Sequence, residues 1–93
     1  MTTLVLVEAT PRPGQAQALV DYFKRNFHAR EHDGFHDGAA YVSETENVVL
    51  VTQLWDSVAD FELYLGWRET AGSMGEFEAL LQGEPTIRYF ESR

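Results

Sequence analysis

Residues 48–61 read Val-Val-Leu-Val-Thr-Gln-Leu-Trp-Asp-Ser-Val-Ala-Asp-Phe and contain one strand and the start of a helix. The run 48–55 is rich in β-branched and large apolar residues, a composition typical of a buried strand. Asp56 and Ser57 end this run, and Ser57 followed by Asp60 resembles a capping box in which Asp replaces the usual Glu or Gln. The stretch therefore predicts a strand that leads directly into a helix beginning at Val58.

The residues before this stretch predict two more strands and another helix. Residues 39–43 form an apolar segment that can pair with 48–55 as a hairpin across the polar residues 44–47. Residues 4–9 form a further apolar run, typical of a strand. After Pro13-Gly14-Gln15, apolar residues recur at helical spacing: Ala16, Leu19, Val20, Phe23 and Phe27. The pattern fades at residues 28–30, and Asp33-Gly34 and Asp37-Gly38 predict turns.

The residues after this stretch complete the domain. The second helix has an apolar stripe with Trp67 on its flank: Val58, Phe61, Tyr64 and Leu65. Gly72 and Gly75 interrupt it, and a short third helix ends at Gly83. Residues 86–91 alternate as a last strand with Arg88 and Phe90 on one face. The order is β-α-β-β-α-α-β, which predicts a single α+β domain over residues 1–93.

The strands also predict how the chain assembles. The apolar runs 4–7 and 48–51 favour a sheet that is covered on both faces. A four-stranded sheet with split βαβ connections carries its helices on one face only. We therefore expect a homodimer in which two sheets pack face to face, the alternative being a monomer that exposes an apolar sheet face to water.

Composition excludes several classes of function. The 93 residues leave no room for a second domain, and the absence of cysteine excludes disulfides, thiolate metal sites and cysteine nucleophiles. The net charge is −8, of which residues 44–93, with three basic and ten acidic residues, carry −7. This charge disfavours nucleic acid and anionic membranes as partners. The N-terminus has no basic leader segment and reaches Glu8, and no apolar run spans a bilayer, so we expect a cytoplasmic protein.

The histidines form one pattern that can be interpreted either as a metal site or as a solvated helix end. His28-Ala29-Arg30-Glu31-His32 matches the H-x-x-E-H arrangement in which two His bind zinc and Glu acts as base. Asp33-Gly34 predicts that the helix ends directly after His32, and the chain is too short for a peptidase cleft. We favour a solvated helix end, with adventitious nickel or zinc binding by His28, His32 and Asp33 as the alternative. No nucleotide-binding glycine motif or serine-hydrolase elbow is present.

Several short motifs occur along the chain in an order that indicates a protein family. They are Pro13-Gly14, Gln53-Leu54-Trp55-Asp56-Ser57, Ala59-Asp60-Phe61 and residues 83–90, Gly-Glu-Pro-Thr-Ile-Arg-Tyr-Phe. Together with the order of the elements, they resemble the antibiotic biosynthesis monooxygenase domain over nearly the whole chain. The resemblance implies a ferredoxin-like fold with a four-stranded antiparallel sheet, paired as a dimeric α+β barrel. It also implies a cofactor-independent monooxygenase that uses dioxygen on a phenol, anthrone or quinol.

Such a reaction makes modest demands on the protein. The deprotonated substrate itself supplies the electron that reduces oxygen, so the protein provides an aromatic pocket, a proton acceptor and a donor that holds the enolate, with no metal or flavin. We expect catalytic roles for His28, Tyr64, Trp67 and Arg68, and substrate contacts from Trp55, Phe61 and Arg88. His28 is the expected proton acceptor, because an imidazole titrates near neutrality.

Each of these residues also has a structural interpretation. Tyr64 on an apolar stripe is more often a core residue, Trp67 can cap the core, and the two arginines can form salt bridges. Residues 62–69 lack the His, and the first strand lacks the Asn, that the haem-degrading branch of the family uses, so haem degradation is not expected. The alternative function is a non-catalytic small-molecule-binding or stress-response dimer of the same fold.

Overall fold

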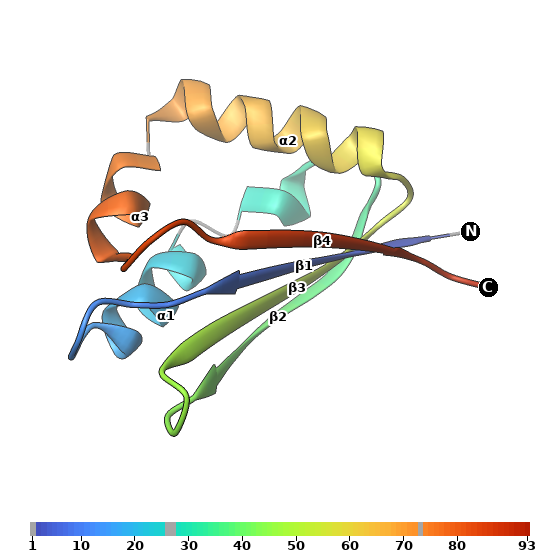
Figure 1. The fold of residues 1–93 in the computed structure, drawn as a ribbon. Coiled ribbons are helices and arrows are strands. Elements are labelled where there is room, and N and C mark those ends of the chain that lie inside the picture. Colours follow the sequence, from blue (N-terminus) through green and yellow to red (C-terminus); the bar gives the residue numbers. More distant parts are fainter. Residues whose placement is uncertain (1, 26–27, 73) are drawn as a thin grey trace.

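The computed structural model describes residues 2–25, 28–72 and 74–93, without the side chain of His28. The elements in chain order are β1 (Thr3–Ala9), α1 (Ala16–Arg25), the 3-10 helix η1 (His28–Glu31), β2 (Phe35–Ser43), β3 (Val48–Trp55), α2 (Val58–Ala71), α3 (Met74–Leu80) and β4 (Thr86–Glu91). The four strands form one antiparallel sheet in the order β2-β3-β1-β4 (Figure 1). The predicted α+β class and four-stranded sheet are confirmed.

The helices cover one face of the sheet, as the connections require (Figure 1). Along β3, buried residues alternate with partly exposed ones, so that Val49, Val51 and Trp55 face the helices. Leu50 and Leu54 face the other side, which we call the open face. The register of the neighbouring strands with β3 and β1 places four more of the described large apolar residues on the open face: Leu4, Leu6, Tyr41 and Phe90. The open face of the protomer therefore carries an apolar strip, and the same register places Glu8, Thr52 and Arg88 on this face.

The helix-covered face holds two clusters of buried side chains. The first packs α1 and α3 on one end of the sheet and contains Ala9, Leu19, Val20, Tyr22, Val49, Phe77 and Leu81. The second packs α2 and η1 on the other end and contains Val5, Ala29, Trp55, Phe61 and Tyr64. Burying one such large apolar side chain contributes roughly 1.5 to 3 kcal/mol, so these clusters dominate the stability of the protomer.

The start of α2 follows the sequence prediction. Ser57 is the N-cap in an extended conformation, and its hydroxyl accepts a hydrogen bond from the backbone N–H of Asp60. The Ser57 hydroxyl in turn donates to the Asp60 carboxylate at 3.0 Å. The capping interaction fixes where α2 begins, and α2 carries Phe61, Tyr64 and Arg68 to the buried side.

The start of β2 differs from the sequence prediction, which placed it at residue 39. The strand begins at Phe35, and Asp37-Gly38, predicted as a turn, lies inside it next to a shift in register between Phe35 and Asp37. Such a β-bulge tolerates the turn-forming pair within a strand. The real turn is at Gly34, whose φ is +90° and where a Cβ atom would come within 2.7 Å of the Asp60 side chain. Only glycine fits between β2 and the first turn of α2.

The buried side of α1 is also rotated relative to the prediction. Tyr22, outside the predicted stripe, is fully buried, whereas Phe23 is only partly buried. Phe27, predicted as the last residue of the stripe, lies outside the described residues. Tyr22 is buried because its ring stacks on Phe77 of α3 at 5.4 Å, a contact that local spacing does not reveal.

None of the described helices is both long enough and apolar enough to cross a membrane.

Candidate functional site

A buried arginine lies where the two core clusters meet. Arg68 on α2 is only 9% exposed, and its Nη2 donates a hydrogen bond to the hydroxyl of Tyr22. Its guanidinium carbon lies 5.4 Å from the centroid of the Tyr22 ring and 6.0 Å from that of Tyr64. Moving a cation out of water is costly, and here a hydroxyl and two aromatic faces offset part of that cost. We call Tyr22, Tyr64 and Arg68 the buried tyrosine–arginine group.

The phenol of Tyr64 is held in its neutral form. Burial raises the pKa of Tyr64 above its usual value of 10.0, and the positive charge of Arg68 and a hydrogen bond from it oppose part of that rise. Tyr64 therefore remains an O–H donor at neutral pH. It is suited to donate to a substrate oxygen and unsuited to act as a base.

The raised pKa of Tyr64 predicts a pH effect on stability. In the unfolded chain this tyrosine ionises near its usual pKa of 10.0, whereas in the folded protein it ionises at higher pH. The contribution of Tyr64 to the free energy of unfolding is fully present below pH 10. It is lost as pH rises through the pKa of the folded protein, because the unfolded state releases the proton first. Subtracting the tyrosinate absorbance of Tyr64→Phe from that of the wild type should give a midpoint above 10.0. A midpoint at or below the usual value would contradict the assignment.

An aromatic surface adjoins this group at the exposed side of α2. The ring of His32 lies 5.0 Å from Tyr64 and 4.9 Å from Trp67, measured between centroids. Trp67 stacks on Tyr64 at 6.2 Å and is 41% exposed. A flat ligand can therefore reach one aromatic ring, Trp67, that is in direct contact with the buried phenol of Tyr64.

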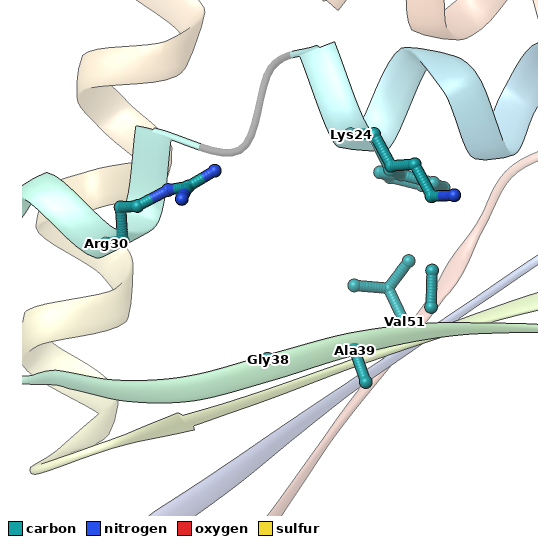
Figure 2. A pocket seen from close by; sticks show the side chains of 7 residues that line it. Lys24, Arg30, Gly38, Ala39 and Val51 are labelled. Atoms are coloured by element: carbon teal, nitrogen blue, oxygen red, sulfur yellow. The ribbon is translucent and has the colours of Figure 1, made fainter.

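A separate pocket opens between α1, η1 and the sheet. It has a volume of about 280 Å³ and is lined by Phe23, Lys24, Arg30, Gly38, Ala39, Ala40 and Val51. Figure 2 shows Val51 pointing into this space, with Lys24 approaching from α1 and Arg30 from η1. The small residues of β2 leave space for a ligand, and Phe23 forms an aromatic wall of the pocket. We call this space the α1–η1 pocket.

The pocket and the buried tyrosine–arginine group are neighbours through two elements. On α1, Phe23 lines the pocket while the preceding Tyr22 binds Arg68, and the two rings are in edge contact at 5.5 Å. On η1, Arg30 lines the pocket while the preceding Ala29 packs in the same cluster as Tyr64. Phe23 therefore contacts both the pocket and the buried tyrosine–arginine group.

The structure brings most of the predicted site residues to one region. Trp55 and Phe61 are buried beneath Tyr64, with ring centroids 5.5 and 6.5 Å from it. Trp67 and Arg68 flank Tyr64 on α2. These five residues form one continuous unit on the helix-covered face.

Of the two remaining predicted residues, Arg88 stands apart from this unit. Tyr89 packs on Phe61 of α2, so its neighbour Arg88 points to the open face, where its guanidinium lies 5.0 Å from the Phe90 ring. The structure does not bring Arg88 to Tyr64 and Arg68 within one protomer. His28 is the first residue of η1, and its side chain lies outside the described structure.

Four residues of this region were not predicted to act there. Tyr22, His32, Lys24 and Arg30 come from α1 and the segment around η1, and only packing of these elements against α2 and β2 brings them to the site. One signal was present in the sequence. Lys24 and Arg30 are among only seven basic residues in a chain of net charge −8, and both are near an apolar stripe.

The histidine pattern begins with His28, whose side chain lies outside the described residues. Among the described residues, no group of three or more His, Asp or Glu side chains could hold a metal ion. His28–Glu31 is a short 3-10 helix, so the α-helical spacing that places two His on one face is absent. His32 instead contacts Tyr64 and Trp67.

Comparison with known proteins identifies the family. The sequence pattern of the family described as antibiotic biosynthesis monooxygenase matches residues 2–71. The chain belongs to the antibiotic biosynthesis monooxygenase family. No curated protein matches the chain at a significant level.

Solved structures share the fold of this family member at low sequence identity. Rv0793 from Mycobacterium tuberculosis superposes with a TM-score of 0.83 at 16% identity, over 100% of this chain and 96% of that one. The monooxygenase from the gene ActVA-Orf6 of Streptomyces coelicolor, in complex with Nanaomycin D, gives 0.82 at 20% identity, over 98% and 87%. SnoaB, a cofactor-independent oxygenase from Streptomyces nogalater, gives 0.82 at 15% identity, over 99% and 93%. These likenesses establish the fold of this antibiotic biosynthesis monooxygenase family member.

Proposed function

We propose that this protein is a cofactor-independent monooxygenase that oxidises a small aromatic substrate, such as a quinol, naphthol or anthrone, with dioxygen. Family membership and two similar structures, a monooxygenase and a cofactor-independent oxygenase, support the reaction class. The observation that carries the proposal is Arg68, a cation kept within an aromatic core beside a neutral phenol. Burying the Arg68 cation costs free energy, and its role in this proposal is to stabilise an anion that forms during the reaction.

The reaction at an activated ring methylene illustrates the electron balance. The substrate loses a proton and becomes an enolate, which gives electrons to dioxygen. One oxygen atom becomes the new carbonyl oxygen, the other leaves as water, and the four electrons come from the two C–H bonds that are lost. The protein must therefore hold the ring, accept a proton and stabilise negative charge on the enolate oxygen.

The residues of the site fit these tasks. We propose that Tyr64 donates a hydrogen bond to the substrate oxygen and that Arg68, held by Tyr22, supplies positive charge beside it. Trp67 offers a partly exposed aromatic face to the substrate ring, while Trp55 and Phe61 support Tyr64 from beneath. His28 remains the proposed proton acceptor.

Oxygen uptake with a panel of quinols, naphthols and anthrones tests this function. We expect uptake above the autoxidation rate for at least one member of the panel, measured with an oxygen electrode against heat-denatured protein. Binding of panel members without any enzyme-dependent uptake would contradict catalysis and support the alternative, a small-molecule-binding dimer of this fold.

We also propose that the protein acts as a homodimer joined through the open faces of two sheets. Leu4, Leu6, Leu50 and Leu54 form an apolar strip across β1 and β3. Tyr41 on β2 and Phe90 on β4 extend it and are 57% and 42% exposed in the protomer. An apolar face of this extent favours a second copy of the sheet over water.

A charge placed at the centre of the open face should separate the subunits. Leu6 is paired with Arg88 across the strands, so Leu6→Glu leaves each sheet with a favourable cross-strand pair. Light scattering should give twice the 10.6 kDa chain mass for the wild type, and Leu6→Glu should raise the dimer dissociation constant about thirtyfold. Gln82→Glu, which adds the same charge outside the sheet, is the control. A wild-type mass of one chain would contradict the dimer.

A further inference from the structure

The α1–η1 pocket differs in charge from the rest of the molecule. Among its described lining residues, Lys24 and Arg30 are cationic and none is acidic, although the whole chain carries a net charge of −8. In Figure 2 both side chains lie above β2, with Arg30 extending from η1 into the space and Lys24 extending from α1 down toward the sheet. A ligand that enters this pocket therefore meets two positive charges.

Lys24 is available to a ligand. Within the described part of the chain its ammonium group takes part in no salt bridge, whereas the adjacent Arg25 is bound to Glu76 of α3 at 2.7 Å. The two neighbours thus have different environments on the last turn of α1. Arg25 ties two helices together, and Lys24 is left facing the pocket.

The rest of the pocket favours an apolar ring of limited size. Phe23 and Val51 give an aromatic and an aliphatic wall, and Gly38, Ala39 and Ala40 line it along β2. Its volume of about 280 Å³ lies just below the range of about 300 to 1,000 Å³ that is typical of pockets for drug-sized ligands. This space suits one or two fused rings better than a larger polycyclic molecule.

We infer that the α1–η1 pocket selects small aromatic anions, which carry a carboxylate or an ionised hydroxyl that Lys24 and Arg30 recognise. Arg30 can bind two oxygens of a carboxylate side by side, and Lys24 contributes a point charge. The inference goes beyond the proposed monooxygenase function, because the pocket lies beside the buried tyrosine–arginine group and is lined by other residues.

The two cations also act before the ligand is bound. An overall charge of −8 repels an anionic ligand from most of the surface, and a local positive region directs it to this opening. Salt screens such interactions, so affinity for an anion should fall as ionic strength rises, whereas affinity for a neutral analogue should stay constant.

Calorimetry with a matched pair of probes tests the inference. At low ionic strength and neutral pH, 2-naphthoate should bind the wild type about tenfold more tightly than the neutral 2-naphthamide. Lys24→Ala and Arg30→Ala should each weaken naphthoate binding about threefold and leave naphthamide binding unchanged. Arg25→Ala removes the same charge from the same helix turn outside the pocket and should not change the preference.

The outcomes separate this inference from the proposed function. Equal affinity for the two probes, no binding of naphthoate, or equal effects of Lys24→Ala and Arg25→Ala would overturn the selection of anions. Oxygen uptake by a protein that does not bind naphthoate would leave the monooxygenase function standing and overturn the inference. Selective naphthoate binding without oxygen uptake on any substrate would support the inference and contradict the monooxygenase function.

Discussion

Arg68→Met should lower kcat about 100-fold for any substrate that the oxygen-uptake panel identifies, with a much smaller change in KM. The reason is that Arg68 is the buried cation beside Tyr64, and losing one group that stabilises a developing anion costs about 100- to 1,000-fold in kcat. Methionine has a similar length and no charge, so it removes the cost of burying a cation, while the Tyr22 hydroxyl loses the hydrogen bond from Arg68 at a cost of about 1 to 3 kcal/mol. The activity should therefore fall without loss of the fold.

Two further variants separate catalysis from general charge. Arg68→Lys keeps the positive charge and should recover part of the lost kcat, although a lysine cannot reproduce the planar contact with both tyrosine rings. Arg12→Met removes one charge from an exposed position and should have no effect on kcat. An Arg68→Met enzyme with the kcat of the wild type would show that Arg68 serves only to join the two core clusters.

Trp55→Ala should reduce the free energy of unfolding by about 3 to 5 kcal/mol. Trp55 has no exposed surface, and its ring packs against Phe35 at 5.4 Å and Tyr64 at 5.5 Å. Its Nε1 donates to the Oε1 of Gln53 at 3.0 Å, so the substitution also leaves a buried amide oxygen without its donor. A domain of this size has only about 5 to 15 kcal/mol in total, so the variant should be close to unfolding.

Urea unfolding followed by circular dichroism measures this loss. All variants should be compared at one protein concentration, because a dimer's apparent stability depends on concentration. Trp67→Ala is the matched control: Trp67 is 41% exposed, and its removal should cost about 1 kcal/mol. A loss below about 1 kcal/mol for Trp55→Ala would show that the second core cluster does not stabilise the protomer as the packing implies.

Much of the fold could be predicted from short-range patterns. The strand over residues 48–55, the Ser57 cap and the start of α2 at Val58 agree with the sequence prediction, because β-branched runs and capping side chains act within a few residues. The start of β2 could not be predicted, since Asp37-Gly38 forms either a turn or a bulge, and pairing with β3 selects the bulge. Features that depend on residues close together in the sequence could therefore be predicted, and features that depend on distant residues could not.

The candidate site was predicted in part for the same reason. Tyr64, Trp67 and Arg68 lie on one helix, so helical spacing alone places them together. The prediction grouped Arg88 with them because an arginine suits an anion, but strand alternation and the Phe61–Tyr89 contact place it on the open face. Nothing in local spacing links Tyr22 to Arg68, which are 46 residues apart.

The sequence by itself determined the α+β class, the order of the elements, the acidic charge and the identity of one helix as the carrier of Tyr64 and Arg68. Tertiary structure alone decided that Tyr22 holds Arg68, that His32 contacts Tyr64 and Trp67, and that Lys24 and Arg30 share a pocket. The physical reason is range. Propensity, capping and periodicity act over a few residues, whereas a binding site forms where helices and strands that are distant in the chain bury their apolar faces against one another.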